Sequence, residues 1–514
     1  MSALETAAHP ERLCRVAIDP LSRVEGHGKV TLLADRDHHI RQARLHIVEF
    51  RGFEKFIQGR PYWEVPVAVQ RLCGICPVSH NLAAAKAVDQ LVGAHQIPPT
   101  AEKIRRLMHY GQTLQSHAVH FFHLASPDFL FDFDNPVAQR NIGGVMADYP
   151  DVARQGVQLR KYGQEVIRIT AGKRVHGTGT VPGGVNKALT LQERNYLLKD
   201  LELMTQWGRN ILKLMKNAYA TNPGYFTHFA AIQSNYLSLI RPDGALDLYH
   251  GGLRAKSDQG NLLFDHLDYR RYSQVIREQV KSWSYMKFPF INSLGPDKGW
   301  YRVGPLARIN NCDFIPTPVA EEERHEFMAL NNGQPIHATL AYHWARMIEL
   351  LYATEAIREL LLDPDIFGDD LVARGEMTQE GVGVIEAPRG TLFHHYRINE
   401  DGLIEKANLI VSTTNNNQAM NESIRQVAEN YLDGKELTEP LLNQIEVAVR
   451  AYDPCLSCAT HALGKMPLHV ELVDDAGEVV DRLVRDADGA IHSQRNSRAP
   501  SAMNPTLITV SASR

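Results

Sequence analysis

Residues 70–80 read QRLCGICPVSH and residues 450–461 read RAYDPCLSCATH, and each stretch contains a pair of cysteines separated by two residues. The pairs are Cys73 with Cys76 and Cys455 with Cys458. Two thiolates on one turn can bind one metal ion, or can form a redox-active pair. For a single isolated pair, half of a zinc site, a redox pair and coincidence all remain open.

Two such pairs in one chain favour a metal. Structural zinc modules usually place their two halves roughly 15 to 20 residues apart. Here 379 positions separate them (455 minus 76), so the fold itself must bring the pairs together. Four thiolates suit nickel, zinc or an iron–sulfur cluster, and the softness of the ligands does not choose among these.

The composition predicts a large globular protein. Of 514 residues, 44% are hydrophobic and 22% are charged, and the net charge of -4 gives no basic face for nucleic acid. The first residues contain no apolar targeting segment and no twin arginine, and no apolar run approaches about 18 residues. We therefore expect a cytoplasmic protein without a membrane span. Six cysteines are too few for a disulfide scaffold, and Cys14 and Cys312 are expected to be small apolar residues.

Hydrophobic periodicity predicts a mainly α-helical fold with small β elements (α+β), built on a bundle of long helices. Alternating residues at 28–50 predict an N-terminal β-hairpin. The last helix ends at Asp453-Pro454, which places Cys455 and Cys458 on the following turn. The polar stretch beyond residue 486 is expected to be poorly ordered. Helices are expected at 100–124, 191–220, 268–284, 338–363, 417–432 and 438–451.

Six strings lie around the cysteines along the chain: IDPLSRVEGHGKV (18–30), EFRGFEKFIQGR (49–60), QRLCGICPVSH (70–80), EAPRGTLFHHY (386–396), STTNNNQAMN (412–421) and RAYDPCLSCATH (450–461). With them the sequence resembles the large-subunit family of nickel-iron hydrogenases along nearly its whole length. It is most similar to the cytoplasmic, bidirectional, NAD-reducing branch. The resemblance implies an enzyme that reversibly cleaves H2.

The resemblance implies a nickel ion held by all four thiolates. Cys73 and Cys455 would be terminal ligands, while Cys76 and Cys458 would bridge to an iron that carries CO and two cyanides. The implied proton acceptor is Glu25 in RVEGH, although such a glutamate taken by itself is more often a solvated surface residue.

The resemblance also implies that Arg389 in EAPRG lies over the open metal position, with Asp128 and Asp453 as its carboxylate companions and Pro388 shaping the pocket. Alone, an arginine of this kind is more often part of a surface ion pair. Thr413 would donate to a cyanide, although Ser412 stands where many relatives have proline. His80 would lie near the sulfur of Cys76; a core histidine with a satisfied partner is the alternative.

A magnesium site is implied as well, formed by Glu54, the backbone carbonyl near Leu409 and the side chain of His461. The family also implies a precursor: domain 1–461 would be catalytic, and 462–514 an extension cut off between His461 and Ala462 by a maturation protease after a chaperone delivers nickel. Within the extension, LHVELVDDAGEVVDRLV (468–484) predicts two strands joined by a turn.

No dinucleotide-binding motif is found, so this chain is not expected to bind NAD itself. The implied partners are a flavin-containing, iron–sulfur diaphorase module and an iron–sulfur small subunit. Alternatives remain: a hydrogen-sensing regulatory subunit, a sulfhydrogenase or another hydrogenase with a different acceptor, a quinone-interacting subunit of a respiratory complex, and a structural subunit bearing zinc or a cluster. A sensor usually ends near the last histidine, whereas this chain continues for 53 residues (514 minus 461). The respiratory subunit lacks the metal cysteines that are present here.

Overall fold

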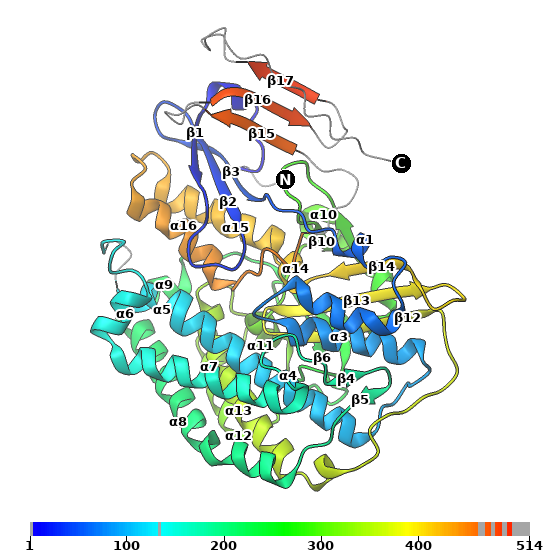
Figure 1. The fold of residues 1–514 in the computed structure, drawn as a ribbon. Helices are drawn as coiled ribbons and strands as arrows, with labels where there is room; N and C mark the ends of the chain where they lie inside the picture. The colour runs from blue at the N-terminus through cyan, green and yellow to red at the C-terminus, as the bar shows by residue number, and fades with distance from the viewer. Residues whose placement is uncertain (1–3, 132–134, 461–467, 474–478, 486–490, 496–514) are drawn as a thin grey trace.

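The computed structural model describes residues 4–131, 135–460, 468–473, 479–485 and 491–495. Within these residues, long helices form most of the chain and short strands form small sheets around them (Figure 1). The prediction of a mainly α-helical fold with small β elements is confirmed. No described helix combines the length and the apolar character that a membrane span requires.

Four long helices form the centre of the helical body: α4 (Pro99–Val119), α7 (Pro150–Ala171), α8 (Leu191–Thr221) and α13 (Ala341–Leu362). α4 packs against α7 and α13, and α13 also packs against α8 and α12 (Pro318–Ala329). α8 begins where the Thr190 hydroxyl accepts from the Glu193 amide and the Glu193 carboxylate accepts from the Thr190 amide. Most of the surface of α13 is buried, so this helix lies at the centre of the helical body.

Most predicted helices are present. Those at 191–220, 338–363 and 438–451 correspond to α8, α13 and α16 (Glu439–Ala451). The prediction for 100–124 corresponds to α4 followed by a π-helical turn, η4 (His120–Ala125). The prediction for 417–432 corresponds to α15 (Asn417–Val427) followed by a second such turn, η8 (Ala428–Leu432).

The helix predicted at 268–284 is wrong. This segment forms a 3-10 turn, η5 (Tyr269–Gln274), and then a strand, β9 (Ile276–Gln279). The Asp268 carboxylate accepts from the Arg270 amide and starts the tight turn, and β9 pairs antiparallel with β10 (Phe288–Ile291). Tertiary pairing has therefore overridden a helix-like pattern, as it often does for short segments.

The N-terminal sheet has three antiparallel strands in the order β1 (Cys14–Ile18), β2 (Gly28–Ala34) and β3 (Ile40–Ile47). It is thus one strand wider than the predicted hairpin. Of the two cysteines expected to be small apolar residues, Cys312 is buried, whereas Cys14 is exposed on the edge strand.

A second antiparallel sheet positions the cysteine loops. Its strands are β12 (Glu380–Ala387), β13 (Gly390–Ile398) and β14 (Ile404–Ile410), and helix α3 (Pro77–Leu91) packs across β12 and β13. The start of α3 therefore lies close to the turn between β12 and β13. A further sheet, β11 (Tyr301–Arg302), β6 (Asn235–Ile240), β7 (Gly252–Lys256) and β8 (Leu262–Leu267), shares a small apolar core with β12 and β13.

The main core cluster runs through the long helices and includes all four paired cysteines.

Short elements connect the helices and sheets described above. The remaining elements are η1 (Pro10–Arg12), α1 (Phe53–Phe56), η2 (Tyr62–Glu64), α2 (Val65–Ala68), η3 (Val69–Leu72), α5 (Ser126–Leu130), α6 (Ile142–Asp148), β4 (Thr180–Val181), β5 (Gly184–Val185), α9 (Pro223–Thr227), η6 (Asn292–Leu294), α10 (Gly295–Lys298), α11 (Pro305–Asn311), η7 (Pro364–Phe367) and α14 (Ser412–Asn415).

The C-terminal extension contains an antiparallel sheet of β15 (Leu468–Val473), β16 (Val479–Arg485) and β17 (Ile491–Arg495). It lies at the top of the view in Figure 1, outside the helical body. β15 and β16 are the two strands that the sequence predicts, whereas β17 falls in a stretch for which no strand is predicted. His461 and Ala462, the expected cleavage site, lie outside the described residues.

Candidate metal centre

The four paired cysteines converge on one buried point. Their sulfur atoms all lie within 4.8 Å of one another. The Sγ atoms of Cys73 and Cys455 are 3.3 Å apart, and those of Cys455 and Cys458 are 2.7 Å apart. All four are free thiols. Two turns from opposite ends of the chain therefore build one cluster, as the spacing of the pairs predicts.

Local backbone contacts shape each turn. In the first, the amides of Ile75 and Cys76 both donate to the sulfur of Cys73 at 3.2 Å, and Pro77 then begins α3. In the second, the amide of Cys455 donates to the Thr413 hydroxyl at 2.9 Å. The amide of Leu456 donates to the carbonyl of Glu25 at 2.9 Å. The second turn is therefore anchored both to the N-terminal segment and to α14.

Burial makes this cluster unfavourable as four thiolates without a cation. The pKa of the Cys76 thiol is well below its ordinary value, because the thiols of Cys455, Cys458 and Cys73 hydrogen-bond to it, and His80 adds another hydrogen bond. Burial instead raises the pKa values of the Cys455 and Cys458 thiols well above the ordinary value. A bound metal cation would remove this penalty, so the donor set fits a soft metal.

Arg389 is the buried cation beside the cluster. Its Nε donates to the carbonyl of Asp453 at 2.7 Å, and its Nη2 donates to the carboxylate of Asp453 at 3.0 Å. Burial alone would lower the pKa of Arg389, but Asp453 and the neighbouring thiols raise it well above its ordinary value. Burial raises the pKa of Asp453 to about 6, against the opposing effect of Arg389. The predicted pairing of these two residues is present.

Asp128 is not a companion of Arg389. One of its carboxylate oxygens accepts from Arg23 Nη2 at 2.6 Å, and the other accepts from Arg450 Nη1 at 2.6 Å. The second contact of Arg389 is instead the hydroxyl of Ser116, 3.4 Å from Nη1. Asp128 therefore fixes α5 to α16, and its role beside Arg389 has to be corrected.

A small cavity of about 10 Å³ lies beside Cys76 and Cys455. The hydroxyl of Thr413 accepts the Cys455 amide and still has its own hydrogen to donate. The hydroxyl of Ser79 is buried and has no hydrogen-bond partner among the described residues, while Ser412 donates to the carbonyl of Gly390 at 2.7 Å. The cavity is lined by these residues together with His80, Pro388 and Arg389.

Glu25 lies beside the second cysteine turn. Its carboxylate accepts from the hydroxyl of Ser457, and from the amide of Ser457 at 3.3 Å. A backbone bridge pairs Glu25 with Cys455. Its side chain is only partly buried, so the carboxylate lies between the solvent and the cysteine turn.

His80 and Cys76 are in contact, and a histidine pair continues away from them. Nδ1 of His80 is 3.2 Å from Nε2 of His394, whose Nδ1 hydrogen-bonds to the hydroxyl of Tyr396. All three rings are buried. His80 is therefore a core histidine with a partner and also a neighbour of the cluster.

Two of the three residues expected at the magnesium site are brought together. The carboxylate of Glu54 accepts from the Leu409 amide at 2.8 Å and faces the ammonium group of Lys287 at 3.4 Å. The Lys287 ammonium is also 3.4 Å from Glu278 and 3.5 Å from Asn408. The third expected residue, His461, lies outside the described residues.

Sequence reasoning missed Ser79, Ser116 and Lys287. Ser79 follows Cys76 by three residues on α3, so the helical period could have placed it on the same face. No motif marks Ser116 or Lys287, since both come to the site only through tertiary packing.

Comparisons with known proteins agree with this geometry. A family model described as nickel-dependent hydrogenase matches residues 51–137 and 249–461, which together exceed half of the chain. A HoxL-like model matches residues 15–50. The beta subunit of the NAD-reducing hydrogenase HoxS from Cupriavidus necator is 47% identical over 92% of this chain and 99% of its own.

Two further proteins match a similar length of the chain. One subunit of the F420-non-reducing hydrogenase from Methanothermobacter thermautotrophicus is 40% identical over 92% of this chain and 100% of its own. A crystal structure of an NAD+-reducing NiFe hydrogenase in the H2-reduced state superposes with a TM-score of 0.86 at 56% identity. That match covers 87% of this chain and 99% of the other.

Proposed function

The chain belongs to the nickel-dependent hydrogenase family and is the catalytic large subunit of a NiFe hydrogenase, and from this premise we propose that its H2 chemistry is coupled to NAD. The observation that carries the H2 chemistry is the joining of four buried thiols from the two ends of the chain beside a cavity that Arg389 lines. The similarity to the NAD-reducing enzymes supports NAD as the final acceptor.

The four thiols would hold the metals. Cys73 and Cys455 would bind nickel alone, and Cys76 and Cys458 would bind both nickel and iron. The small ligands of the iron, CO and two cyanides, would lie at the cavity beside Cys76 and Cys455, which offers hydrogen-bond donors. Thr413 and Ser79 each have a hydroxyl hydrogen to donate there, and Arg389 adds a fixed positive charge. When bound, such a centre supplies the two-electron chemistry that splits H2 heterolytically.

Side chains of this protein would accept the proton and stabilise the charge that forms. Glu25 is placed by Leu456 and Ser457 next to the turn that carries Cys455, where its carboxylate can accept a proton and pass it outward. Arg389, held by Asp453, keeps a positive charge at the edge of the cavity and stabilises negative charge that develops there. Pro388 shapes the adjacent wall.

A magnesium ion would join the two ends of the catalytic domain. We propose Glu54, the carbonyl of Leu409 and His461 as its ligands; the contact between Glu54 and the Leu409 backbone supports this. The ion would have to displace the Lys287 ammonium, which lies 3.4 Å from Glu54. The oxygen atoms of Glu54, Glu278 and Asn408 around that ammonium are ligands that suit a hard cation.

Electrons would leave through partner subunits. We propose a flavin-containing diaphorase module and an iron–sulfur small subunit, in a cytoplasmic complex, on the basis of the NAD-reducing relatives. Residues 1–461 would be the catalytic domain and 462–514 a maturation extension, removed between His461 and Ala462 after a chaperone delivers nickel. The described strands of the extension, β15 to β17, lie outside the helical body and are compatible with removal.

One experiment tests the proposed function. The chain is purified with its co-purifying subunits, its metals are measured, and H2-dependent reduction of NAD+ is followed by the absorbance of NADH. Nickel together with iron, and NADH formation that requires H2, would support the proposal. Zinc alone would contradict the metal assignment. Activity with viologen dyes but not with NAD+ would contradict the acceptor.

A further inference from the structure

Arg308 on α11 makes contacts that the site described so far does not use. Its side chain is 1% exposed, in the middle of the protein. Nε and Nη2 donate to the two oxygens of Glu349 on α13, at 2.5 and 2.6 Å. Nη1 donates to the carboxylate of Glu386 at 2.8 Å. Burial is costly for an arginine unless its donors are satisfied, and this side chain has a full set of partners.

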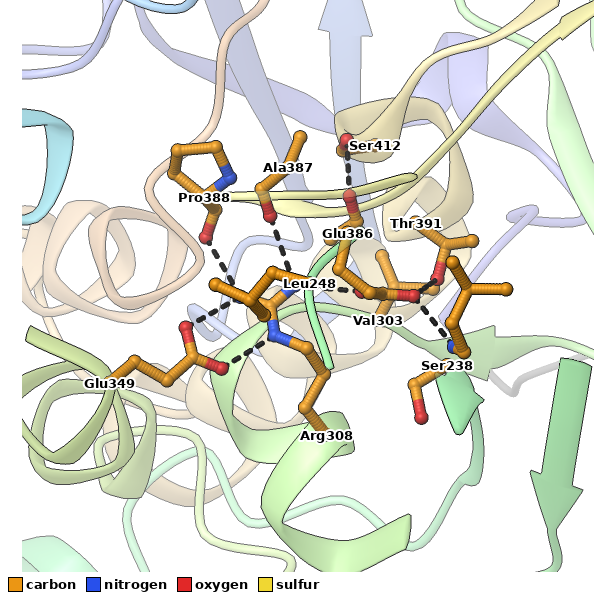
Figure 2. Close-up of polar contacts among 12 residues, drawn as sticks. Ser238, Leu248, Val303, Arg308, Glu349, Glu386, Ala387, Pro388, Thr391 and Ser412 are labelled. Atoms are coloured by element: carbon orange, nitrogen blue, oxygen red, sulfur yellow. Dashed lines mark hydrogen bonds and ion pairs between the residues drawn. The ribbon is translucent and has the colours of Figure 1, made fainter. Parts of the chain in front are cut away.

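The two remaining donors reach backbone. Nη1 also donates to the carbonyl of Ala387 at 2.9 Å, and Nη2 donates to the carbonyl of Pro388 at 3.3 Å. Figure 2 shows the guanidinium between Glu349 on one side and the carbonyls of Ala387 and Pro388 on the other. All five N–H groups of Arg308 are therefore used, and two of them hold the residues that immediately precede Arg389.

This backbone belongs to a tight turn. Ala387 pairs with Gly390 across β12 and β13, so Pro388 and Arg389 are the two residues of the hairpin loop. The loop is packed closely from outside: a Cβ on Gly390, where φ is 135°, would come within 2.2 Å of the Val303 side chain. The position of the loop thus decides where the Arg389 side chain begins.

Glu349, the carboxylate that pairs with Arg308, lies close to a second contact of Arg389. Glu349 accepts from Nε2 of His117 at 3.0 Å, and the neighbouring Ser116 contacts Nη1 of Arg389. The pKa of Glu349 is lowered to about 2, because Arg308 and His117 outweigh its burial. Glu349 therefore stays ionised, and the ion pair holds α11, α13 and the β12–β13 loop together.

We propose that Arg308 is a positioning residue for Arg389: it fixes the carbonyls of Ala387 and Pro388 and so places the Arg389 guanidinium at the edge of the metal cavity. The inference rests on the proposed function, in which Arg389 acts on what binds there. Arg308 does not itself line the cavity, and its effect passes through the carbonyls of Ala387 and Pro388, two residues that do.

The test is a double-mutant cycle. Arg308→Lys keeps the charge but has three donors, too few for the five bonds that Arg308 makes to Glu349, Glu386 and the two carbonyls. Arg389→Lys removes the planar group itself. The matched control is Arg105→Lys, since Arg105 is also fully buried, pairs with both oxygens of Asp89 and donates to the carbonyl of Gly184. Readouts are the kcat and KM for H2 with a viologen dye, nickel content, and the infrared bands of CO and cyanide.

The proposal expects Arg308→Lys to lower kcat about tenfold with nickel retained, since small misplacements near reacting groups cost one to two orders of magnitude. It should shift the cyanide bands in the same direction as Arg389→Lys, and it should add less than about a twofold loss to the Arg389→Lys enzyme. Arg105→Lys should leave the bands in place and have the same effect on both backgrounds.

An equal loss from Arg308→Lys on both backgrounds, or unshifted bands, would overturn the positioning role. If Arg389→Lys itself changes neither turnover nor the bands, the proposed role of Arg389 fails instead. Should Arg308→Lys not fold, Glu349→Gln replaces it, because the amide oxygen keeps one bond to Arg308 while the other is lost. The same band shift, smaller in size, is then expected, and its absence would overturn the inference.

Discussion

Asp453 binds Arg389 twice, through its backbone carbonyl at 2.7 Å from Nε and through its carboxylate at 3.0 Å from Nη2. Asp453 has φ of 53°, a left-handed conformation, and lies two residues before Cys455. One residue therefore sets both the direction of the second cysteine turn and the orientation of the cation beside it. The second cysteine turn and the cavity charge are therefore linked by the backbone itself.

The four paired cysteines should each be indispensable. Replacing Cys73, Cys76, Cys455 or Cys458 by serine should abolish H2 turnover, because a neutral hydroxyl is a poor ligand for a soft metal. Nickel content and H2-dependent dye reduction check this. Cys312→Ser is the matched control, since Cys312 is buried but not part of the cluster. Wild-type turnover in any of the four variants would refute the ligand assignment.

Glu25→Gln should lower H2 turnover without preventing assembly of the metal centre. The amide keeps the size and can still meet Ser457 but cannot accept a proton, so turnover should fall by about 10²- to 10⁴-fold with nickel content unchanged. The exposed Glu405→Gln serves as control. Full turnover by the Glu25 variant would mean that protons leave by another route.

Thr413 and Thr414 offer a matched pair of buried threonines. Thr413→Val leaves the Cys455 amide without its acceptor and removes a donor to the cavity, whereas the Thr414 hydroxyl has no partner to lose. We expect Thr413→Val to destabilise by about 1–3 kcal/mol and to shift a cyanide band. Thr414→Val should do neither. Identical infrared spectra for both variants would argue against a Thr413 contact with a cyanide.

Lys86 should make stability depend on pH. Burial lowers its pKa to about 7 from 10.5, although its ammonium donates to the carbonyls of Tyr249 and Val384. The unfolded chain therefore binds more protons between these values, and the free energy of unfolding should rise with pH from about 7 to 10, by up to ~1.4 kcal/mol per unit. Denaturant unfolding of the purified protein measures the slope.

Lys86→Met should flatten that slope, and the exposed Lys199→Met should preserve it. A slope unchanged by Lys86→Met would show that this ammonium remains charged in the folded protein throughout the range.

The mature large subunit should end at His461. Intact-mass measurement of the active enzyme should find a chain without residues 462–514, because we propose that the extension is removed after nickel insertion. An inactive, nickel-free preparation should retain the extension. An active subunit that still carries residues 462–514 would contradict the processing proposal.

The sequence predicts those parts of the protein that depend on local spacing. The cysteine turns and most long helices follow from periodicity, from Pro364 after α13 and from Pro454 before Cys455. The pairing of Asp128 with Arg23 and Arg450 could not be predicted, because each partner comes from a distant segment. The pairing of β9 with β10 joins neighbouring segments, but the helix-like pattern at 268–284 hid it. The same holds for Ser116 beside Arg389, which no motif marks.

The distance along the chain between Cys73 and Cys455, 382 residues, also has a consequence during protein synthesis. At about 5–20 residues per second, the first cysteine pair leaves the ribosome roughly 20 to 80 s before the second. During that interval it is a bare two-thiol chelator, open to zinc or to oxidation. We therefore expect the first pair to need protection from other metals and from oxidants until the second pair has been synthesised.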